Sequence, residues 1–360
     1  MHRNDVTFPA RLLSWYDRVR RDLPWRVPAG RSGAPHPYHV LVSELMLQQT
    51  QVAIVVPYFH RFLARFPTLA DLAAADEQDV LRLWQGLGYY SRARNLHRAA
   101  KRVVAEHGGH VPAGMEQLLD LPGVGRYTAG AVASIAFGVQ APILDGNVTR
   151  VLCRLDGITD DPRDREVQTR LWTRAEEILP PIRVGDFNSA LMELGATVCT
   201  PRSPKCLLCP VATACVAQAR GIQEDIPPPK KAKPTPLERR VVLCVARGDH
   251  WLIEQRPATG RWAGMWQFVT RPEPAGADPV PPPVPVGPAT RIGRVEHQLT
   301  HRRYTFDVTC CRSTDDSPAA IAGPHAWVTL EGLKDYPLPK PHVKVASLLR
   351  TRALEQAPPS

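Results

Sequence analysis

The chain has 360 residues, enough for two domains with separate cores. Apolar residues make up 44% of it, which excludes a disordered protein, and no apolar run approaches the ~20 residues of a membrane-spanning helix. The formal net charge of +10 favours an acidic partner such as nucleic acid or an anionic membrane surface. The N-terminal segment carries charges where a signal peptide would be apolar, so we expect a cytoplasmic protein, associated with the nucleoid if bacterial.

Helical spacing of apolar residues dominates the first part of the chain. It predicts helices over residues 11–22, 40–52, 76–87, 93–107 and 127–138. Short connections rich in Gly, Pro and Asp separate these segments, so we expect an all-α domain.

A proline-rich stretch then divides the chain. Residues 226–236 hold five prolines and three lysines, a composition typical of a stiff, solvated linker. The predicted organisation is a first domain over 1–221, a linker over 222–237, a second domain over 238–353 and a tail over 354–360.

Beyond the linker, the apolar pattern changes to alternation. Residues 239–256 and 302–312 alternate and are rich in β-branched side chains, which predicts strands. Residues 342–356 predict a closing helix, and the eight prolines of residues 272–288 predict a long surface loop. The second domain should therefore be α+β.

A turn at Leu121–Gly125 raises the first question about function. Its two glycines, Gly123 and Gly125, can bring backbone N–H groups close to a phosphate at the start of the following helix, where the helix dipole favours an anion. A tight turn that binds nothing is the alternative, and the motif alone does not decide between them.

Four of the eight cysteines cluster within one loop. They follow the spacing C-x6-C-x2-C-x5-C and are Cys199, Cys206, Cys209 and Cys215. Four thiolates can hold an iron–sulfur cluster or a zinc ion, and the spacing does not separate the two. Disulfides are not expected in a chain without an export signal.

Two carboxylates are candidates for acid–base chemistry. Glu44 lies among apolar residues, where burial would raise the pKa of its carboxyl and suit it to be an acid, but it also shares a helical face with Gln48 and Gln51 that water could cover. Asp145 lies in an Asp-Gly turn, and Asn147 could cap the next helix. From these residues alone, the solvated face and the cap are the better interpretations.

The order of these motifs over about residues 8–220 resembles the helix-hairpin-helix DNA glycosylases of the endonuclease III superfamily. The resemblance implies a [4Fe–4S] cluster on the four cysteines and a hairpin whose Gly123 and Gly125 face a DNA phosphate without reading sequence. It also implies that Glu44 and Asp145 are catalytic, with Asn147 beside them.

Tyr127 narrows the resemblance. In endonuclease III itself, the residue two past the second hairpin glycine is a lysine, whose amine attacks the sugar, and such an enzyme also cuts the strand. With Tyr127 in that place, the chain resembles the MutY-type adenine DNA glycosylases, which use water and leave an abasic site. That family acts on double-stranded DNA in which adenine is mispaired with 8-oxoguanine or guanine.

The same resemblance implies residues that enter the DNA stack when the base is flipped out. By position they are Gln49, Thr50, Leu87 and Tyr89. Residues 85–105 carry five Lys or Arg side chains and no acidic one, which suits a helix that faces phosphates. Ordinary packing of the tyrosine and a solvated basic face are the alternatives.

Residues 251–268 resemble the start of a Nudix fold. The paired glutamates that hold magnesium in Nudix hydrolases do not follow, so we expect no nucleotide hydrolysis. In MutY-type enzymes such a domain recognises the base opposite adenine. The corresponding loop holds His297, Leu299, Thr300 and His301. Thr300 keeps a hydroxyl that could bond to the base edge, whereas Leu299 stands in the place of an aromatic residue, and the strength of the preference for 8-oxoguanine stays open.

The sequence therefore predicts a monomeric, monofunctional adenine DNA glycosylase with an all-α helix-hairpin-helix domain and a Nudix-like domain. Two alternatives remain open. One is a pyrimidine glycosylase/lyase like endonuclease III, against which Tyr127 and the C-terminal domain argue. The other is an inactive iron–sulfur DNA-binding protein, against which Glu44 and Asp145 argue.

Overall fold

The computed structural model describes residues 7–28, 30–31, 33–229, 234–273, 282–314 and 323–355. The chain forms two compact units. The first unit comprises residues 1–74 and 95–231, and the second unit comprises residues 75–94 and 232–360. The domain boundaries drawn from composition remain predictions.

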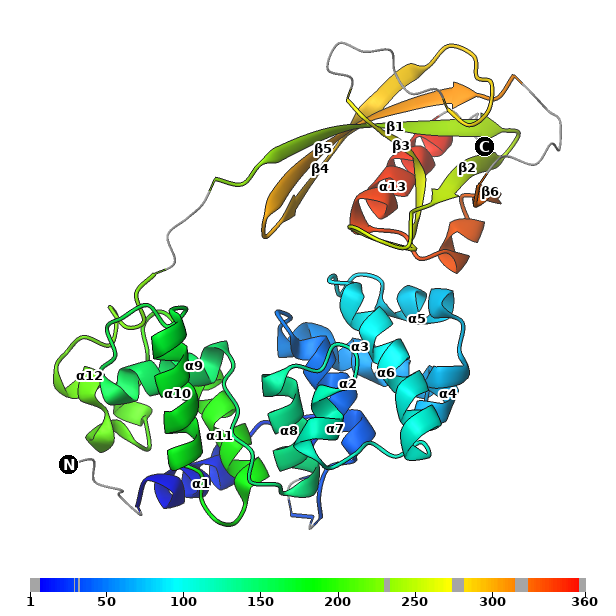
Figure 1. The fold of residues 1–360 in the computed structure, drawn as a ribbon. Coiled ribbons are helices and arrows are strands. Elements are labelled where there is room, and N and C mark those ends of the chain that lie inside the picture. The colour runs from blue at the N-terminus through cyan, green and yellow to red at the C-terminus, as the bar shows by residue number, and fades with distance from the viewer. Residues whose placement is uncertain are drawn as a thin grey trace. The chain divides into compact units, whose positions relative to one another are not determined.

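The first unit is helical, as predicted (Figure 1). Its helices are α1 (Thr7–Val19), α2 (Pro37–Leu47), α3 (Val52–Arg65), α4 (Leu69–Ala74), α7 (Met115–Leu119), α8 (Arg126–Phe137), α9 (Gly146–Asp156), α10 (Arg165–Glu177), α11 (Val184–Thr197) and α12 (Val216–Ala219), with 3-10 turns η1 (Cys206–Leu208) and η2 (Ala212–Ala214). Helix α6 (Ser91–His107) contributes its first turn to the second unit and the rest to the first. Apolar residues of α1, α9, α10 and α11 form one buried core, with Leu12, Leu152, Leu171 and Phe187 fully enclosed.

The helix predicted over 40–52 is two helices. Helix α2 ends at Leu47, and Gln49 adopts a left-handed backbone with φ +57° before α3 begins at Val52. A residue in this conformation cannot continue a right-handed helix. Gln48 and Gln51 therefore do not share one helical face with Glu44, and the sequence interpretation of a solvated face is wrong there.

The predicted hairpin lies between α7 and α8. Leu121 to Val124 form a turn closed by the Val124 N–H, which donates to the Leu121 carbonyl over 3.1 Å. Gly123, with φ +80°, follows Pro122 in the pattern of a type II turn. A Cβ on Gly123 would come within 2.6 Å of the Asn95 amide nitrogen, so only glycine fits without a shift. Gly125 is the N-cap of α8.

The second unit contains α5 (Glu77–Trp84) and a six-stranded mixed sheet with the order β4-β5-β1-β3-β2-β6. The strands are β1 (Leu237–Arg247), β2 (His250–Gln255), β3 (Trp266–Pro272), β4 (Thr290–Leu299), β5 (Arg302–Arg312) and β6 (His325–Thr329), followed by η3 (Gly332–Asp335) and α13 (Lys340–Glu355). Strands β1 and β5 are parallel, and the other pairs are antiparallel. The α+β prediction is confirmed.

Helix α13 covers one face of this sheet (Figure 1). Its Val345 and Leu349 pack with Phe268 and Phe306 from the strands. The opposite face carries a smaller apolar cluster around Val245 and Val269. Because successive side chains of a strand point to opposite faces, β1, β2 and β5 were predictable from alternating apolar residues, and α13 was predictable from helical spacing. Strands β3, β4 and β6 were not predicted. Part of the predicted proline-rich loop, residues 274–281, lies outside the described residues.

Strands β4 and β5 form a hairpin in which Leu299 pairs with Arg302. Thr300 and His301 are therefore the two residues of its turn, and both are exposed. Among the described helices, none is long and apolar enough to cross a membrane.

Candidate active site and DNA-binding surfaces

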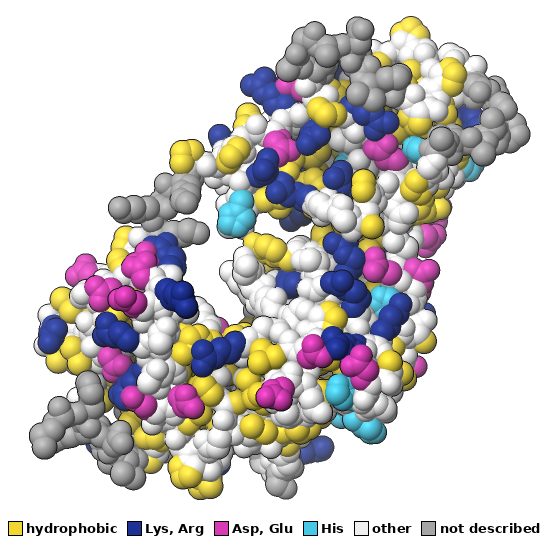
Figure 2. Space-filling view, in the orientation of Figure 1, with side chains coloured by type: hydrophobic (Ala, Val, Ile, Leu, Met, Phe, Trp, Pro, Cys, Tyr) yellow, Lys and Arg dark blue, Asp and Glu magenta, His cyan; other side chains and the backbone are white. Residues whose placement is uncertain are grey.

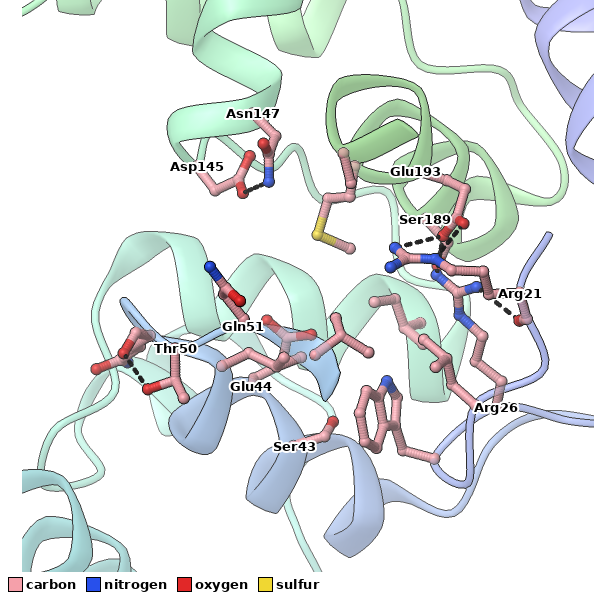
Figure 3. Close-up of a pocket in the computed structure, with 18 of the residues that line it drawn as sticks. Arg21, Arg26, Ser43, Glu44, Thr50, Gln51, Asp145, Asn147, Ser189 and Glu193 are labelled. Carbon is pink, nitrogen blue, oxygen red and sulfur yellow. Dashed lines mark hydrogen bonds and ion pairs between the residues drawn. The ribbon is translucent and has the colours of Figure 1, made fainter. Parts of the chain in front are cut away.

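The first unit contains a pocket of about 780 Å³. Its walls come from the segment before α2, from α2 and the turn after it, from α8, from the start of α9 and from α11 (Figure 3). The lining includes Arg21, Trp25, Arg26, Glu44, Gln48, Gln49, Thr50, Tyr127, Asp145, Asn147, Met192 and Glu193. Residues from five separate parts of the chain thus face one cavity.

Glu44 lies on α2 and is only 4% exposed. The pKa of its carboxyl is raised to about 7, chiefly by burial and also by the negative charge of Asp145, although the hydrogen bond from Tyr127 and the charge of Arg26 lower it. A carboxyl with this pKa is partly protonated at neutral pH. It can therefore deliver a proton to a group bound in the pocket.

Tyr127, on the first turn of α8, is partly buried against the core. Its hydroxyl donates a 2.6 Å hydrogen bond to Oε2 of Glu44 and lies 3.2 Å from Sδ of Met192. Burial and the neighbouring carboxyls raise the pKa of this phenol well above its usual value. Tyr127 is therefore a neutral donor that orients the carboxyl of Glu44.

Asp145 is the N-cap of α9. One carboxyl oxygen accepts the Val148 N–H at 2.7 Å, and the other accepts the Asn147 side-chain amide at 3.0 Å. The capping role given to Asn147 from the sequence is thus wrong, because Asp145 itself precedes the first helical residue, Gly146. Burial raises the pKa of Asp145, and these hydrogen bonds lower it.

Arg150 connects this site to the cysteine loop. Its guanidinium donates to the Asn147 side-chain oxygen at 2.9 Å, to the Gly195 carbonyl at 2.7 Å and to the Cys199 carbonyl at 2.8 Å. Helices α9 and α11 approach closely here, since a Cβ on Gly195 would lie 2.6 Å from Cβ of Asn147. Arg150 thus joins Asn147, a hydrogen-bond partner of Asp145, to the backbone of Cys199. Nothing in the sequence pattern indicated this link.

The four clustered cysteines line one small cavity of about 30 Å³. Arg154, almost fully buried, lines it too, and donates to Sγ of Cys199 at 3.3 Å and to the Thr200 carbonyl at 2.7 Å. Burial raises the pKa of Cys209 to about 11, and the neighbouring thiols add to that rise. Among the described residues, no three His, Cys, Asp or Glu side chains converge as the ligands of a single metal ion do.

A buried ion pair forms another wall of the pocket, and the sequence did not indicate it. Glu193 on α11 is 1% exposed. Its carboxylate accepts Arg21 at 2.5 and 3.1 Å and Arg26 at 2.9 Å. These contacts outweigh burial and lower the pKa of Glu193. Among the described residues, three carboxyls thus line the pocket: Glu44 and Asp145 have a raised pKa, whereas Glu193 has a lowered one and stays ionised.

The residues expected to contact DNA in the first unit lie on its surface. Gln49 is exposed in the left-handed turn after α2, with Thr50 partly buried beside it. Gly123 and Gly125 are exposed in the hairpin. In Figure 2, Lys and Arg side chains are spread over the visible face of each unit with acidic ones among them, so the net charge is not gathered in one patch on this face.

In the second unit, Tyr89 is 42% exposed, whereas Leu87 is 6% exposed and lies inside its turn. The Tyr89 hydroxyl and Oγ1 of Thr300 are 2.8 Å apart. Leu299 packs on the core of the sheet, and His297 lies 5.9 Å from the Trp262 ring. Burial lowers the pKa of His297, as do Lys344 and Lys340. The fold thus brings together Tyr89 and Thr300, which are 211 residues apart.

Comparisons with known families define the class of protein. Residues 42–177 match the HhH-GPD superfamily of base excision DNA repair proteins, and residues 240–348 match the NUDIX domain. A solved thermostable thymine-DNA glycosylase is 31% identical, with a TM-score of 0.53 over 59% of this chain and 96% of that one. A solved endonuclease III–DNA covalent intermediate is 24% identical, with a TM-score of 0.50, and shows the fold alone.

Closer relatives define the family. The adenine DNA glycosylase of Rattus norvegicus is 41% identical over 92% of this chain and 76% of its own length. The human enzyme, from Homo sapiens, is 40% identical over 91% of this chain and 71% of its own length. The enzyme of Schizosaccharomyces pombe is 35% identical over 73% of this chain and 69% of its own length. The chain belongs to the adenine DNA glycosylases.

Proposed function

We propose that this chain hydrolyses the N-glycosidic bond of adenine opposite 8-oxoguanine or guanine in double-stranded DNA, and that it leaves an abasic site without cutting the strand. Its family makes it an N-glycosyl hydrolase of base excision repair. The observation that carries the finer proposal is that two carboxyls face one pocket: Glu44, buried with its pKa raised to about 7, and Asp145, whose carboxylate accepts hydrogen bonds from Val148 and Asn147.

Glu44 acts as the acid. Adenine is a poor leaving group until a ring nitrogen is protonated, and Glu44 holds a proton near neutral pH. The bond between the base and C1′ breaks with its electron pair on the base, and the proton of Glu44 moves to the ring nitrogen. Tyr127 keeps the carboxyl aimed into the pocket through its 2.6 Å hydrogen bond.

Asp145 stabilises the sugar that remains. Loss of the base leaves an oxocarbenium-like ring, whose positive charge a nearby carboxylate stabilises. A water molecule then adds to C1′ and loses its proton to a carboxylate. Tyr127 has no amine to form a Schiff base, which supports hydrolysis alone without strand cleavage.

Glu193 recognises the purine. A carboxylate has about four acceptor positions, and three are used by Arg21 and Arg26. The remaining position can accept the exocyclic amino group of adenine, which guanine lacks at the same ring position. Because both arginines hold Glu193, it stays charged and fixed when the base enters.

The turn of the β4–β5 hairpin reads the opposite base. Thr300 and His301 are exposed there, and the Thr300 hydroxyl can exchange its hydrogen bond with Tyr89 for one to a base edge. Leu299 packs inward, so it supports the turn and does not stack on DNA. Together with Gln49, Thr50 and the hairpin glycines, Tyr89 would hold the duplex while adenine is extruded.

A [4Fe–4S] cluster bound by Cys199, Cys206, Cys209 and Cys215 would join the end of α11 to the start of α12 and hold the loop between them for DNA binding. The four side chains line one cavity without converging on a point. A single zinc ion requires sulfurs about 2.3 Å from one centre, whereas a cubane of four irons takes thiolates further apart. Purified protein should contain iron and no zinc by elemental analysis, and Cys206→Ser should remove the iron and weaken DNA binding.

Excision assays test the whole proposal. Duplexes would carry adenine opposite 8-oxoguanine, adenine opposite guanine, or thymine glycol, and borohydride would trap any Schiff base. We expect release of adenine from the first two duplexes and no trapped adduct. Release of thymine glycol with a trapped adduct would instead establish a pyrimidine glycosylase/lyase.

A further inference from the structure

The turn that carries Tyr89 has an unusual backbone. Gly86, Gly88 and Tyr89 all have positive φ, at 103°, 74° and 46°. The first two positions are glycines, which adopt such angles without a steric cost, but Tyr89 is not. A left-handed tyrosine with 42% of its surface exposed needs support from the surrounding structure.

Arg92 supplies that support. It is 6% exposed, and its guanidinium nitrogen Nη2 donates to the Leu87 carbonyl at 3.3 Å and to the Gly88 carbonyl at 3.2 Å. The guanidinium carbon also lies 5.6 Å from the Trp84 ring and 5.4 Å from the Tyr89 ring. One side chain thus satisfies two carbonyls of the turn and supports the aromatic ring that the turn presents.

Two neighbouring side chains close the turn from other directions. The Trp84 indole N–H donates to the Gly88 carbonyl at 3.3 Å, and the Gly86 N–H donates to the Tyr90 hydroxyl at 3.2 Å. Both Tyr90 and Trp84 are buried. Arg92 contacts both the carbonyls of the turn and the exposed ring of Tyr89.

We propose that Arg92 is a positioning residue for the insertion of Tyr89 into DNA, and not a phosphate contact. This inference rests on the proposed role of Tyr89 in the DNA stack. The sequence counted Arg92 among five basic side chains of a phosphate-facing helix, but its burial in the turn excludes it from that set. Burial lowers the pKa of its guanidinium to about 10, so it remains charged at neutral pH.

Lysine cannot replace arginine here. A guanidinium is planar, so it can stack between rings while its edge donates to two carbonyls, whereas an ammonium is a compact point charge. Arg92→Lys keeps the net charge, and therefore the general attraction to DNA, while it removes the paired hydrogen bonds to the turn carbonyls and the stacking on the Tyr89 ring. The folded state of each variant is checked by its thermal unfolding midpoint.

The test is a double-mutant cycle of Arg92→Lys and Tyr89→Ala on a duplex with adenine opposite 8-oxoguanine. Affinity and the fluorescence of 2-aminopurine beside the mispair, which reports unstacking, are measured for all four proteins. We expect each single variant to lose affinity about tenfold and the double variant to be no worse than Tyr89→Ala, because coupled neighbours are not additive. We expect the 2-aminopurine unstacking signal to fall in Arg92→Lys and in Tyr89→Ala alike.

Salt dependence separates the two roles of an arginine. Loss of one phosphate contact lowers the slope of log affinity against log salt by about 0.9, whereas loss of a positioning residue leaves the slope unchanged. A third variant, Arg92→Met, removes the charge and is used for the salt measurement. Additive effects in the cycle, or a reduced salt slope for Arg92→Met, would overturn the inference while leaving Tyr89 as the inserted residue. A Tyr89→Ala variant equal to wild type would overturn both this inference and the proposed role of Tyr89.

Discussion

The pocket of the first unit and the two exposed turns of the second unit are held in shape by different means. In the pocket, Glu44 and Glu193 are 4% and 1% exposed and are fixed by hydrogen bonds or ion pairs. In the second unit, Tyr89 and Thr300 are exposed, and their positions come from a left-handed backbone and a two-residue hairpin turn. Acid–base chemistry needs the low dielectric of a buried site, whereas contact with DNA needs accessible side chains.

This contrast predicts that changes in the pocket alter the rate of bond cleavage, and that changes in the turns alter affinity and choice of DNA.

The largest effect should come from Glu44→Gln, which removes the transferable proton with almost no change in shape. We expect single-turnover excision to fall at least about 10³-fold, within the range of general acid catalysis, while DNA affinity is retained. The exposed Glu176→Gln is the control. Near-normal excision by the pocket variant would reject Glu44 as the acid.

Arg150→Lys should have the next largest effect. Arg150 donates to Cys199 from Nε and to Asn147 and Gly195 from Nη2, and the single nitrogen of lysine cannot occupy both positions. Asn147 and Asp145 would shift, and a misplacement near 1 Å costs about 10²-fold in rate. Single-turnover excision at saturating enzyme measures this, with Arg165→Lys on the surface of α10 as the matched control. The iron content of the variant is measured as well. If the molecules that keep their iron excise adenine at the wild-type rate, Arg150 does not position Asp145 and the link is refuted.

Thr300→Ala tests the turn of the second unit. Loss of one hydroxyl contact to the altered base should cost roughly 1–3 kcal/mol of discrimination, seen as a reduced preference for 8-oxoguanine over guanine. The excision rate of adenine opposite guanine should hardly change. Thr290→Ala, on the exposed start of β4, is the control. An unchanged ratio of the two substrates would assign the C-terminal domain to another role, such as stability or a protein partner.

Tyr127→Phe should have the smallest and most specific effect. The hydrogen bond from Tyr127 lowers the pKa of Glu44, so its removal should raise that pKa above its present value of about 7. Because the acid must be protonated to act, activity is present below this pKa and is lost as pH rises through it. The alkaline limb of the rate profile should therefore move to higher pH. A limb that stays in place or moves to lower pH would contradict the assignment.

Local pattern in the sequence was sufficient for several features. Helical periodicity, strand alternation and the spacing of the four cysteines are properties of neighbouring residues, so the all-α and α+β parts and the Leu121–Gly125 turn were predictable. The resemblance of motif order to a glycosylase family supplied Glu44 and Asp145 as candidates. From the residues alone, a solvated surface position and a helix cap are the better interpretations.

Only the tertiary structure decided how these residues behave. The exposed fraction of Glu44, and hence its pKa, depends on α8, which packs against α2, and on α9 and α11, which form other walls of the pocket, and no local pattern encodes this arrangement. The ion pair of Glu193, the link from Arg150 to Cys199 and the meeting of Tyr89 with Thr300 each join segments far apart in the chain. The sequence pattern suggested that Arg92 contacts phosphate, but in the fold Arg92 is buried and donates to the carbonyls of a strained turn. Electrostatic strength depends on distance and on exclusion of water, and both are set by the folded chain rather than by residue type.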